Sequence, residues 1–204
     1  MYGMSRLKKA FTVTVAFLLV ISLFLTSVPV SAAVKLSSKQ KNAIRALLKV
    51  VDPAYNKVYF GKSTKVSARS TYRYIYWAAG HKTLYGHKLI RPYKINRNTN
   101  AMDDIVYTKK QVVKISKGIF GNIRKISYSG IMTKKDKCYF IYEEPNGGCE
   151  YKVYATKALK NKSIAIRASA YSTNSEKFVG NIQMTLKPSK STCFGYYIVE
   201  IKRV

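Results

Sequence analysis

The stretch KFVGNIQMTLK, residues 177–187, alternates apolar with polar side chains over most of its length. A period of two places one kind of side chain on each face of a β-strand. The side chains expected on the buried face are Phe178, Ile182, Met184 and Leu186. Because the other face is polar, the segment predicts an antiparallel sheet with one face covered and one face in water.

Similar patterns lie on both sides of this segment. Strands are predicted at 123–132, 137–144, 149–156, 163–172, 177–187 and 194–202. The Pro-Asn-Gly-Gly turn at 145–148 predicts a hairpin in which Tyr142 faces Tyr151 and Phe140 faces Val153. The side chains that would then share the core face are Cys138, Phe140, Tyr142, Cys149, Tyr151 and Val153.

Residues 37–51 predict a first helix, because apolar residues recur at helical spacing and Asp52-Pro53 ends the pattern. The opposite face of this helix is basic and carries Lys39, Lys41, Arg45 and Lys49. A basic amphipathic helix can lie on an anionic membrane. Near the start of a folded domain, packing of its apolar stripe on the core is favoured.

Two more helices are predicted before the strands. One covers 70–79 and ends at Gly80, the residue that follows its apolar stripe. The other begins at Thr108, which forms a capping box with Gln111, and it ends at Gly121.

Helices followed by a long antiparallel meander predict an α+β fold, with N-terminal helices packed on a bent antiparallel sheet of about five or six strands. With its last strand in FGYYIVEIK, 194–202, this order of elements resembles the nuclear transport factor two-like and cystatin-like secreted domains of Gram-positive bacteria. The resemblance covers most of 37–202 and rests on no signature motif. It implies an accessory or binding module more than an enzyme, and it carries no active site over to this chain.

The first 32 residues have the layout of a cleavable secretory signal, with a basic start, the apolar run 10–28 and a small-residue site. The residues expected before the cut are Val30, Ser31 and Ala32. Cleavage would leave one basic domain at 33–204, secreted or held at the cell surface. The alternative is an uncleaved anchor, because the apolar run is long enough to span a bilayer.

The chain carries 37 basic and 9 acidic residues, for a net charge of +28. The signal contains three of the cations and none of the acids, so the domain after cleavage would carry +25. Such a surface attracts polyanions. The expected partners are an anionic wall polymer or an acidic protein, with an anionic membrane surface as an alternative and nucleic acid bound only without sequence preference. The remaining alternative is a solvated surface that serves solubility.

The segment between the second and third helices is rich in cations and rings. The residues predicted to bind a polyanion are Lys82, Lys88, Arg91, Lys94 and Arg97. The aromatic residues predicted to contact the same ligand are Trp77, Tyr85 and Tyr93. The alternative is an irregular surface connection with ordinary lysines.

Three cysteines would lie in a compartment that permits disulfides. The predicted hairpin places Cys138 too far along the strand from Cys149, so Cys193 is the favoured partner of Cys149 if a disulfide forms. The alternative is three free thiols. No CxxC motif is present and neither histidine lies beside a cysteine, so no metal site and no cofactor are predicted.

No motif assigns a catalytic residue. The acid pairs Asp103-Asp104 and Glu143-Glu144 consist of neighbours, which point to opposite faces of a strand. The first pair is expected to favour the start of the third helix or to pair with nearby lysines. The sequence therefore predicts an exported, non-enzymatic binding domain for an anionic partner. Alternatives are a cationic membrane-active or toxin-like protein and a hydrolase whose cleft is built from residues distant in sequence.

Overall fold

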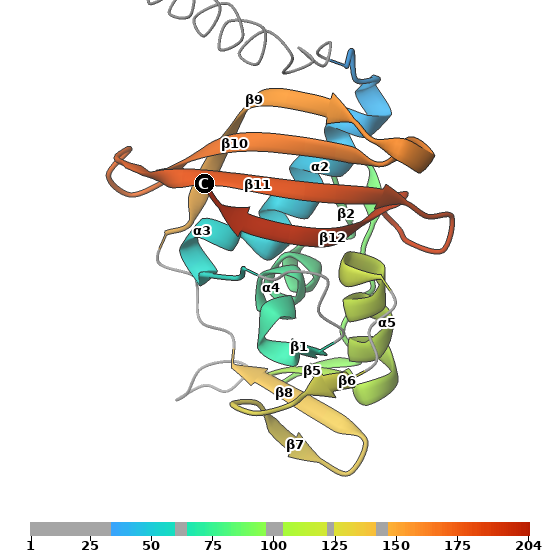
Figure 1. The fold of residues 1–204 in the computed structure, drawn as a ribbon. Coiled ribbons are helices and arrows are strands. Elements are labelled where there is room, and N and C mark those ends of the chain that lie inside the picture. Colours follow the sequence, from blue (N-terminus) through green and yellow to red (C-terminus); the bar gives the residue numbers. More distant parts are fainter. Residues whose placement is uncertain (1–33, 60–64, 97–103, 122–124, 142–146) are drawn as a thin grey trace, which may run out of the picture. The chain divides into compact units, whose positions relative to one another are not determined.

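Four long strands form an antiparallel sheet in the order β12-β11-β10-β9 in the computed structural model of the protein (Figure 1). The strands are β9 (Cys149–Ala158), β10 (Ile164–Ser172), β11 (Phe178–Pro188) and β12 (Tyr196–Arg203). Neighbours in the sheet are neighbours along the chain, which confirms the last four strands of the predicted meander. The strand predicted at 123–132 is wrong, because β6 (Lys125–Ser127) and β7 (Met132–Lys134) belong to two other sheets. The structure describes residues 34–59, 65–96, 104–121, 125–141 and 147–204. The predicted signal, and Arg97, Asp103, Tyr142, Glu143 and Glu144, lie outside these residues.

The alternating segment 177–187 lies in β11 and faces the core as predicted at three of its four apolar positions. Ile182, Met184 and Leu186 are buried. Phe178 is 58% exposed, so its predicted burial is wrong. A register shift between β10 and β11 at Ala170 and Tyr171 explains the difference, because the extra residue before Gly180 reverses the direction of the side chains that precede it.

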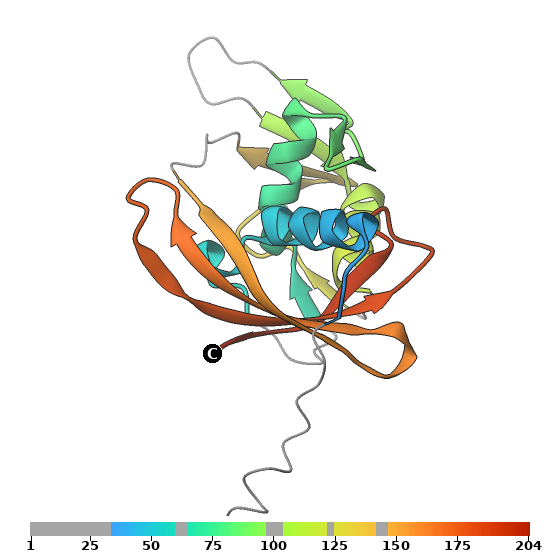
Figure 2. The same ribbon diagram turned by 90° about the horizontal axis from the view of Figure 1, so that it is seen from above.

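Helix α2 (Ser38–Val51) lies across the concave face of the sheet, which curves around it (Figure 2). Ser37 accepts a hydrogen bond from the Gln40 amide, and Gln40 accepts one from the Ser37 amide, so a capping box begins the helix. The residues that α2 buries are Ala43, Ile44, Ala46, Leu47, Leu48, Val50 and Val51. The predicted packing of this helix on the core is confirmed. The short helix α3 (Pro53–Asn56) follows.

Two further helices were predicted with nearly correct bounds. Helix α4 (Tyr72–Gly80) follows a 3-10 turn at Ala68–Thr71. Helix α5 (Lys109–Phe120) begins at the predicted capping box of Thr108 and Gln111. In the described part of the chain, no helix combines the length and the apolar character that crossing a membrane requires.

A second antiparallel sheet has the order β4-β5-β8-β7. Its strands are β4 (Lys94–Asn96), β5 (Asp104–Thr108), β7 (Met132–Lys134) and β8 (Lys137–Ile141). Two short pairs complete the structure, β2 (Thr83–Leu84) with β3 (His87–Lys88) in antiparallel and β1 (Lys65–Ser67) with β6 (Lys125–Ser127) in parallel.

The second sheet corrects the predicted hairpin around 145–148. Phe140 on β8 pairs with Ile105 on β5, and Val153 on β9 pairs with Ala168 on β10. Strands β8 and β9 therefore belong to different sheets, and Val153 is 39% exposed, not part of the core. The physical reason is that β8 pairs with β5 and not with β9. Strand β5 was not predicted, because its three consecutive buried residues do not alternate with polar ones.

The α+β class is confirmed, with the helices between two antiparallel sheets of four strands each. Because β5 runs up to residue 108, Asp104 is a strand residue, and the first turn of α5 contains no acid. The prediction that Asp104 favours the start of that helix is therefore wrong.

Candidate functional site

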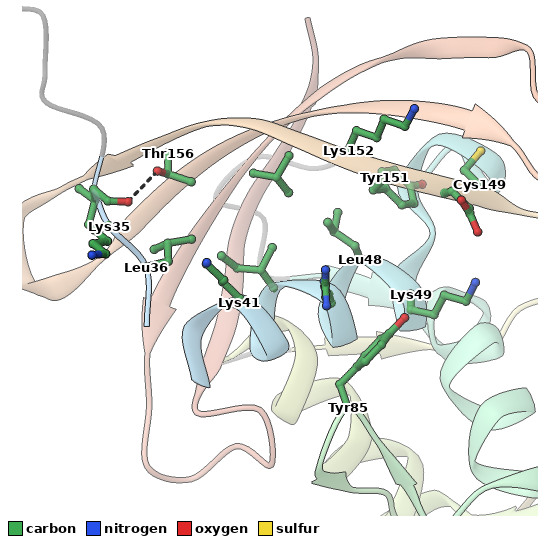
Figure 3. A pocket seen from close by; sticks show the side chains of 15 residues that line it. Lys35, Leu36, Lys41, Leu48, Lys49, Tyr85, Cys149, Tyr151, Lys152 and Thr156 are labelled. Carbon is green, nitrogen blue, oxygen red and sulfur yellow. Dashed lines mark hydrogen bonds between the residues drawn. The ribbon is translucent and has the colours of Figure 1, made fainter. Parts of the chain in front are cut away.

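A groove of about 810 Å³ runs between α2 and β9 (Figure 3). Helix α2, the chain before it, strand β9 and the turn between β2 and β3 all contribute to its walls. The residues that line it are Val34, Lys35, Leu36, Lys41, Ile44, Arg45, Leu48, Lys49, Tyr85, Cys149, Glu150, Tyr151, Lys152, Val153 and Thr156. We take this groove as the candidate ligand site.

The helix wall of the groove is cationic. Lys41, Arg45 and Lys49 follow one another at intervals of four residues, so they lie on one face of α2, about 6 Å apart along its axis. Lys35 adds a fourth cation from the segment before the helix. Among the described residues, the ion pairs are Arg73 with Asp52 and Lys202 with Glu200, and neither involves these four cations.

The floor of the groove is apolar. Ile44 and Leu48 are buried side chains of α2, and Leu36 lies between Lys35 and Lys41 in Figure 3. A ligand in the groove would therefore contact hydrocarbon below and ammonium or guanidinium groups at the rim. Such a combination suits an anionic ligand that also has apolar or backbone surface.

The one acidic residue that lines the groove lies on the other face of its strand. Glu150 pairs with Tyr171 on β10, and Tyr151, its neighbour, pairs with the buried Ala170. Side chains alternate along a strand, so Glu150 and Lys152 point to the convex face. The Lys152 ammonium lies over the Tyr171 ring at 4.9 Å, in agreement with this direction.

A buried network fixes β9 to the end of α2. Asp52 and Arg73 form an ion pair with Nη2 to Oδ2 at 2.7 Å, and both residues are buried. The same Oδ2 accepts from the Cys149 amide at 3.2 Å, and Oδ1 accepts from the Tyr151 hydroxyl at 2.7 Å. Arg73 also donates to the Gly147 carbonyl. These bonds hold the first residues of β9 in place, so the wall of the groove is preorganised.

The thiol and phenol groups at this end are poor nucleophiles at neutral pH. Burial, reinforced by the Asp52 carboxylate, raises the pKa of Cys149 to about 11. The same two causes raise the pKa of the Tyr151 hydroxyl above its usual range. Both groups are therefore protonated at neutral pH, and a thiolate is the form that attacks or binds metal.

The cations that the sequence grouped as one polyanion site lie on different elements. Lys82 and Lys88 are exposed; Lys82 precedes β2, and Lys88 lies in β3, paired with Thr83. Arg91 turns back and donates from Nη1 to the Ala78 carbonyl at 2.8 Å, at the end of α4. Lys94 lies in β4, in the second sheet. These residues have different neighbours, and their joint binding of a polyanion stays a prediction.

The predicted aromatic contacts have three different surroundings. Tyr85 is exposed at the turn between β2 and β3 and lines the groove, with its hydroxyl toward Lys49 in Figure 3. Tyr93 is 59% exposed, beside Lys137, whose ammonium lies 4.7 Å from the ring centre. Trp77 is half-buried, with the Lys49 ammonium 5.3 Å from its ring centre, and it does not line the groove.

The predicted disulfide between Cys149 and Cys193 is not formed, and Cys138 is a free thiol too. Cys149 pairs with Ser172 at one end of the sheet, whereas Cys193 lies in the turn after Pro188 at the other end. The eleven residues of β11 run between these two ends of the curved sheet, so the two cysteines lie at opposite ends of the strands.

His87 lies beside Cys193 without forming a catalytic pair. Its Nδ1 is 2.9 Å from the Cys193 backbone carbonyl, not from the thiol. Burial raises the pKa of the Cys193 thiol to about 11. Within the described ranges, no three His, Cys, Asp or Glu side chains converge as metal ligands.

The basic face of α2 was visible in the sequence, but its role was not. The spacing of four residues placed Lys41, Arg45 and Lys49 on one face, and contact with an anionic membrane was the one role considered for that face. The missing information was the opposite wall: nothing in the sequence indicates that β9 is an edge strand whose first residues approach this helix.

Comparisons of the chain with protein families, with curated proteins and with solved structures found no match. The resemblance to nuclear transport factor two-like and cystatin-like domains therefore stays a prediction.

Proposed function

We propose that this chain is an exported, non-enzymatic binding domain that takes an anionic partner into the groove between α2 and β9. The observation that carries the proposal is the convergence of Lys35, Lys41, Arg45 and Lys49 on a groove of about 810 Å³ whose lining acid, Glu150, points to the other face of its strand. Cations in a concave, partly apolar site attract anions more strongly than cations dispersed over a convex surface.

The location of this activity is part of the proposal. The first 32 residues support export by their basic, apolar and small-residue zones. Outside a Gram-positive cell, the abundant anions are wall polymers and acidic proteins. A domain of net charge +25, after loss of the signal, would be concentrated there by attraction that salt screens.

The membrane-active alternative is less well supported than the groove. Helix α2, which suggested it, uses its apolar residues to fill the core, so that face is not free to enter a bilayer. The hydrolase alternative would need a paired acid and base in the cleft. The described lining residues contain Glu150 as the single carboxylate and no histidine.

The test compares two variants with equal loss of charge. One replaces Lys41, Arg45 and Lys49 by glutamine, and the control replaces Lys82, Lys88 and Lys94 by glutamine. Binding to polyglutamate and to purified Gram-positive walls, with and without teichoic acid, is measured across a salt series.

At about 0.5–1 kcal/mol for each lost cation, the groove variant should bind the polyanion roughly tenfold to a hundredfold more weakly. The control should lose a few fold through its lower net charge. Equal losses in the two variants, or binding that salt does not weaken, would contradict the proposed site.

A further inference from the structure

The wall of the groove opposite α2 is the free edge of a sheet. Strand β9 is last in the order β12-β11-β10-β9, and among the described residues no other strand pairs with its outer side. Five consecutive residues, 149–153, line the groove. Because successive side chains point to opposite faces, an unbroken run of lining residues means that the edge of the strand faces the cavity.

The register identifies which backbone groups point into the groove. The Thr173 amide donates to the Gly148 carbonyl, which makes Cys149 and Ser172 a pair without mutual hydrogen bonds. The Cys149 amide accordingly points outward, to Asp52. Pairs alternate along an antiparallel ladder, so the amide and carbonyl groups of Tyr151 and Val153 also point outward.

The side chains beside this edge leave room for another strand. Val153 is 39% exposed, although its partner on β10, Ala168, is buried. The inner face of β9 is closed at Cys149 and Tyr151, which both donate to Asp52. It is open toward the groove at Val153, and Ile44 and Leu48 line the same groove from α2. An exposed edge of this kind is a template for strand addition.

We infer that the anionic partner is an acidic peptide segment in extended form, which adds to β9 as a further strand. This inference rests on the proposed function and names the partner of the same groove. Charge complementarity selects the occupant. The side chains of an added strand alternate, and those on the concave side face Lys41, Arg45 and Lys49. Acidic residues at every second position would meet this stripe.

The added strand would gain backbone hydrogen bonds that a wall polymer cannot form. Teichoic acid phosphates could meet the same cations, yet they offer no amide to the carbonyl groups of Tyr151 and Val153. The proposal therefore commits to a peptide, and preference for a wall polymer is one of the outcomes of the test.

The experiment uses synthetic peptides that alternate glutamate with threonine, of which the latter favours extended structure. One peptide is N-methylated at every glutamate, a second at every threonine, and a third is unmodified. In an added strand the amides of one set point toward β9 and those of the other set point to solvent. If the peptide is antiparallel to β9, the glutamate amides point toward it, because paired residues share a face. The two methylated peptides have equal charge and are controls for each other.

Strand addition predicts that methylation of one set weakens binding about tenfold or more, from the loss of two or more hydrogen bonds, while methylation of the other set has little effect. Equal affinities for both methylated peptides would overturn the inference. If both methylated peptides nevertheless bound the glutamine variant of Lys41, Arg45 and Lys49 more weakly than the unsubstituted protein, anion binding in the groove would be supported and strand addition would not.

Two other outcomes separate the proposals further. If teichoic acid bound through the groove cations and the peptide failed to displace it, strand addition would be wrong and the anion site would stand. If no anionic probe distinguished the groove variant from its control, both proposals would fall.

Discussion

Helix α2, which forms one wall of the groove, and the basic segment 81–96 each contain four lysine and arginine residues, but the fold arranges these cations in different ways. On α2 a spacing of four residues directs Lys41, Arg45 and Lys49 to one face. In the basic segment Arg91 binds the end of α4, and Lys94 joins the second sheet. The number of cations in a segment therefore does not indicate whether their side chains line one site. On α2 they do, because the helix places them on one face, opposite β9.

The two regions also differ in how they are held. The groove ends on the buried pair of Asp52 and Arg73, whose hydrogen bonds reach Cys149 and Tyr151. The β2–β3 pair consists of two residues on each strand. A preorganised site keeps its charges in place before the ligand arrives, which lowers the ordering cost of binding.

Removal of the carboxylate of Asp52 should have the largest effect. Asp52→Ala leaves the Arg73 guanidinium buried without its partner, which costs about 3–5 kcal/mol of unfolding free energy. Glu200→Ala is the matched control, because the ion pair of Glu200 with Lys202 lies at the surface and should change stability by about 1 kcal/mol or less. Chemical denaturation of both variants measures the difference; equal losses would mean that the buried pair does not anchor the groove.

The reactivity of two thiols, Cys149 in the groove and Cys193 beside His87, tests how closed the groove wall is. Burial raises the pKa of Cys149 and of Cys193 from 9.0 to about 11, so each thiolate fraction at neutral pH is about a hundredfold below that of an unperturbed thiol. Cys149 is 3% exposed, whereas Cys193 is exposed as a residue although its thiol group turns inward to the Tyr74 hydroxyl. Alkylation followed by mass spectrometry should modify Cys193 first, and both rates should rise with pH up to about 11. Faster reaction at Cys149 would show that the groove wall opens.

Two glycines compare the packing at the start of β9 with the packing at the end of α4. A Cβ at Gly148 would overlap the Arg73 guanidinium and crowd Asp52, so Gly148→Ala should cost about 1–3 kcal/mol. A Cβ at Gly80, at the end of α4 beside the basic segment, meets nothing within 4 Å. Gly80→Ala should be neutral or stabilise by up to about 1 kcal/mol. Thermal unfolding with opposite signs would support the account, whereas loss at Gly80 alone would contradict it.

The smallest expected effect is optical. Trp77 is the one tryptophan of the chain, and the Lys49 ammonium lies over its ring. An anion that draws Lys49 into the groove should change the emission of Trp77 by a modest amount. Lys49→Gln should remove this change while Lys94→Gln keeps it. If neither substitution altered the emission change on binding, Trp77 would not report on the groove.

Local signals in the sequence predicted the helices well. The capping boxes at Ser37 and Thr108 lie within one turn of chain, so no tertiary information is needed to place the starts of α2 and α5. The meander β9 to β12 followed from alternation and short connections in the same way.

Pairing between distant strands could not be predicted. Ile105, Val106 and Tyr107 are all buried in β5, so this strand lacks the alternation that marks a half-buried one. Without it, β8 had no visible partner other than β9, and the wrong hairpin followed. The groove was missed for the same reason, since it depends on β9 being left at the edge of its sheet.

The most direct test is a titration of the isotope-labelled protein with polyglutamate, followed by the backbone amide signals in nuclear magnetic resonance spectra. The account predicts that saturable shifts concentrate on residues 41–49 of α2 and 150–156 of β9, and that they weaken as salt is added. Shifts spread over every lysine-bearing surface, or confined to 82–94, would contradict the claim that the groove is the binding site.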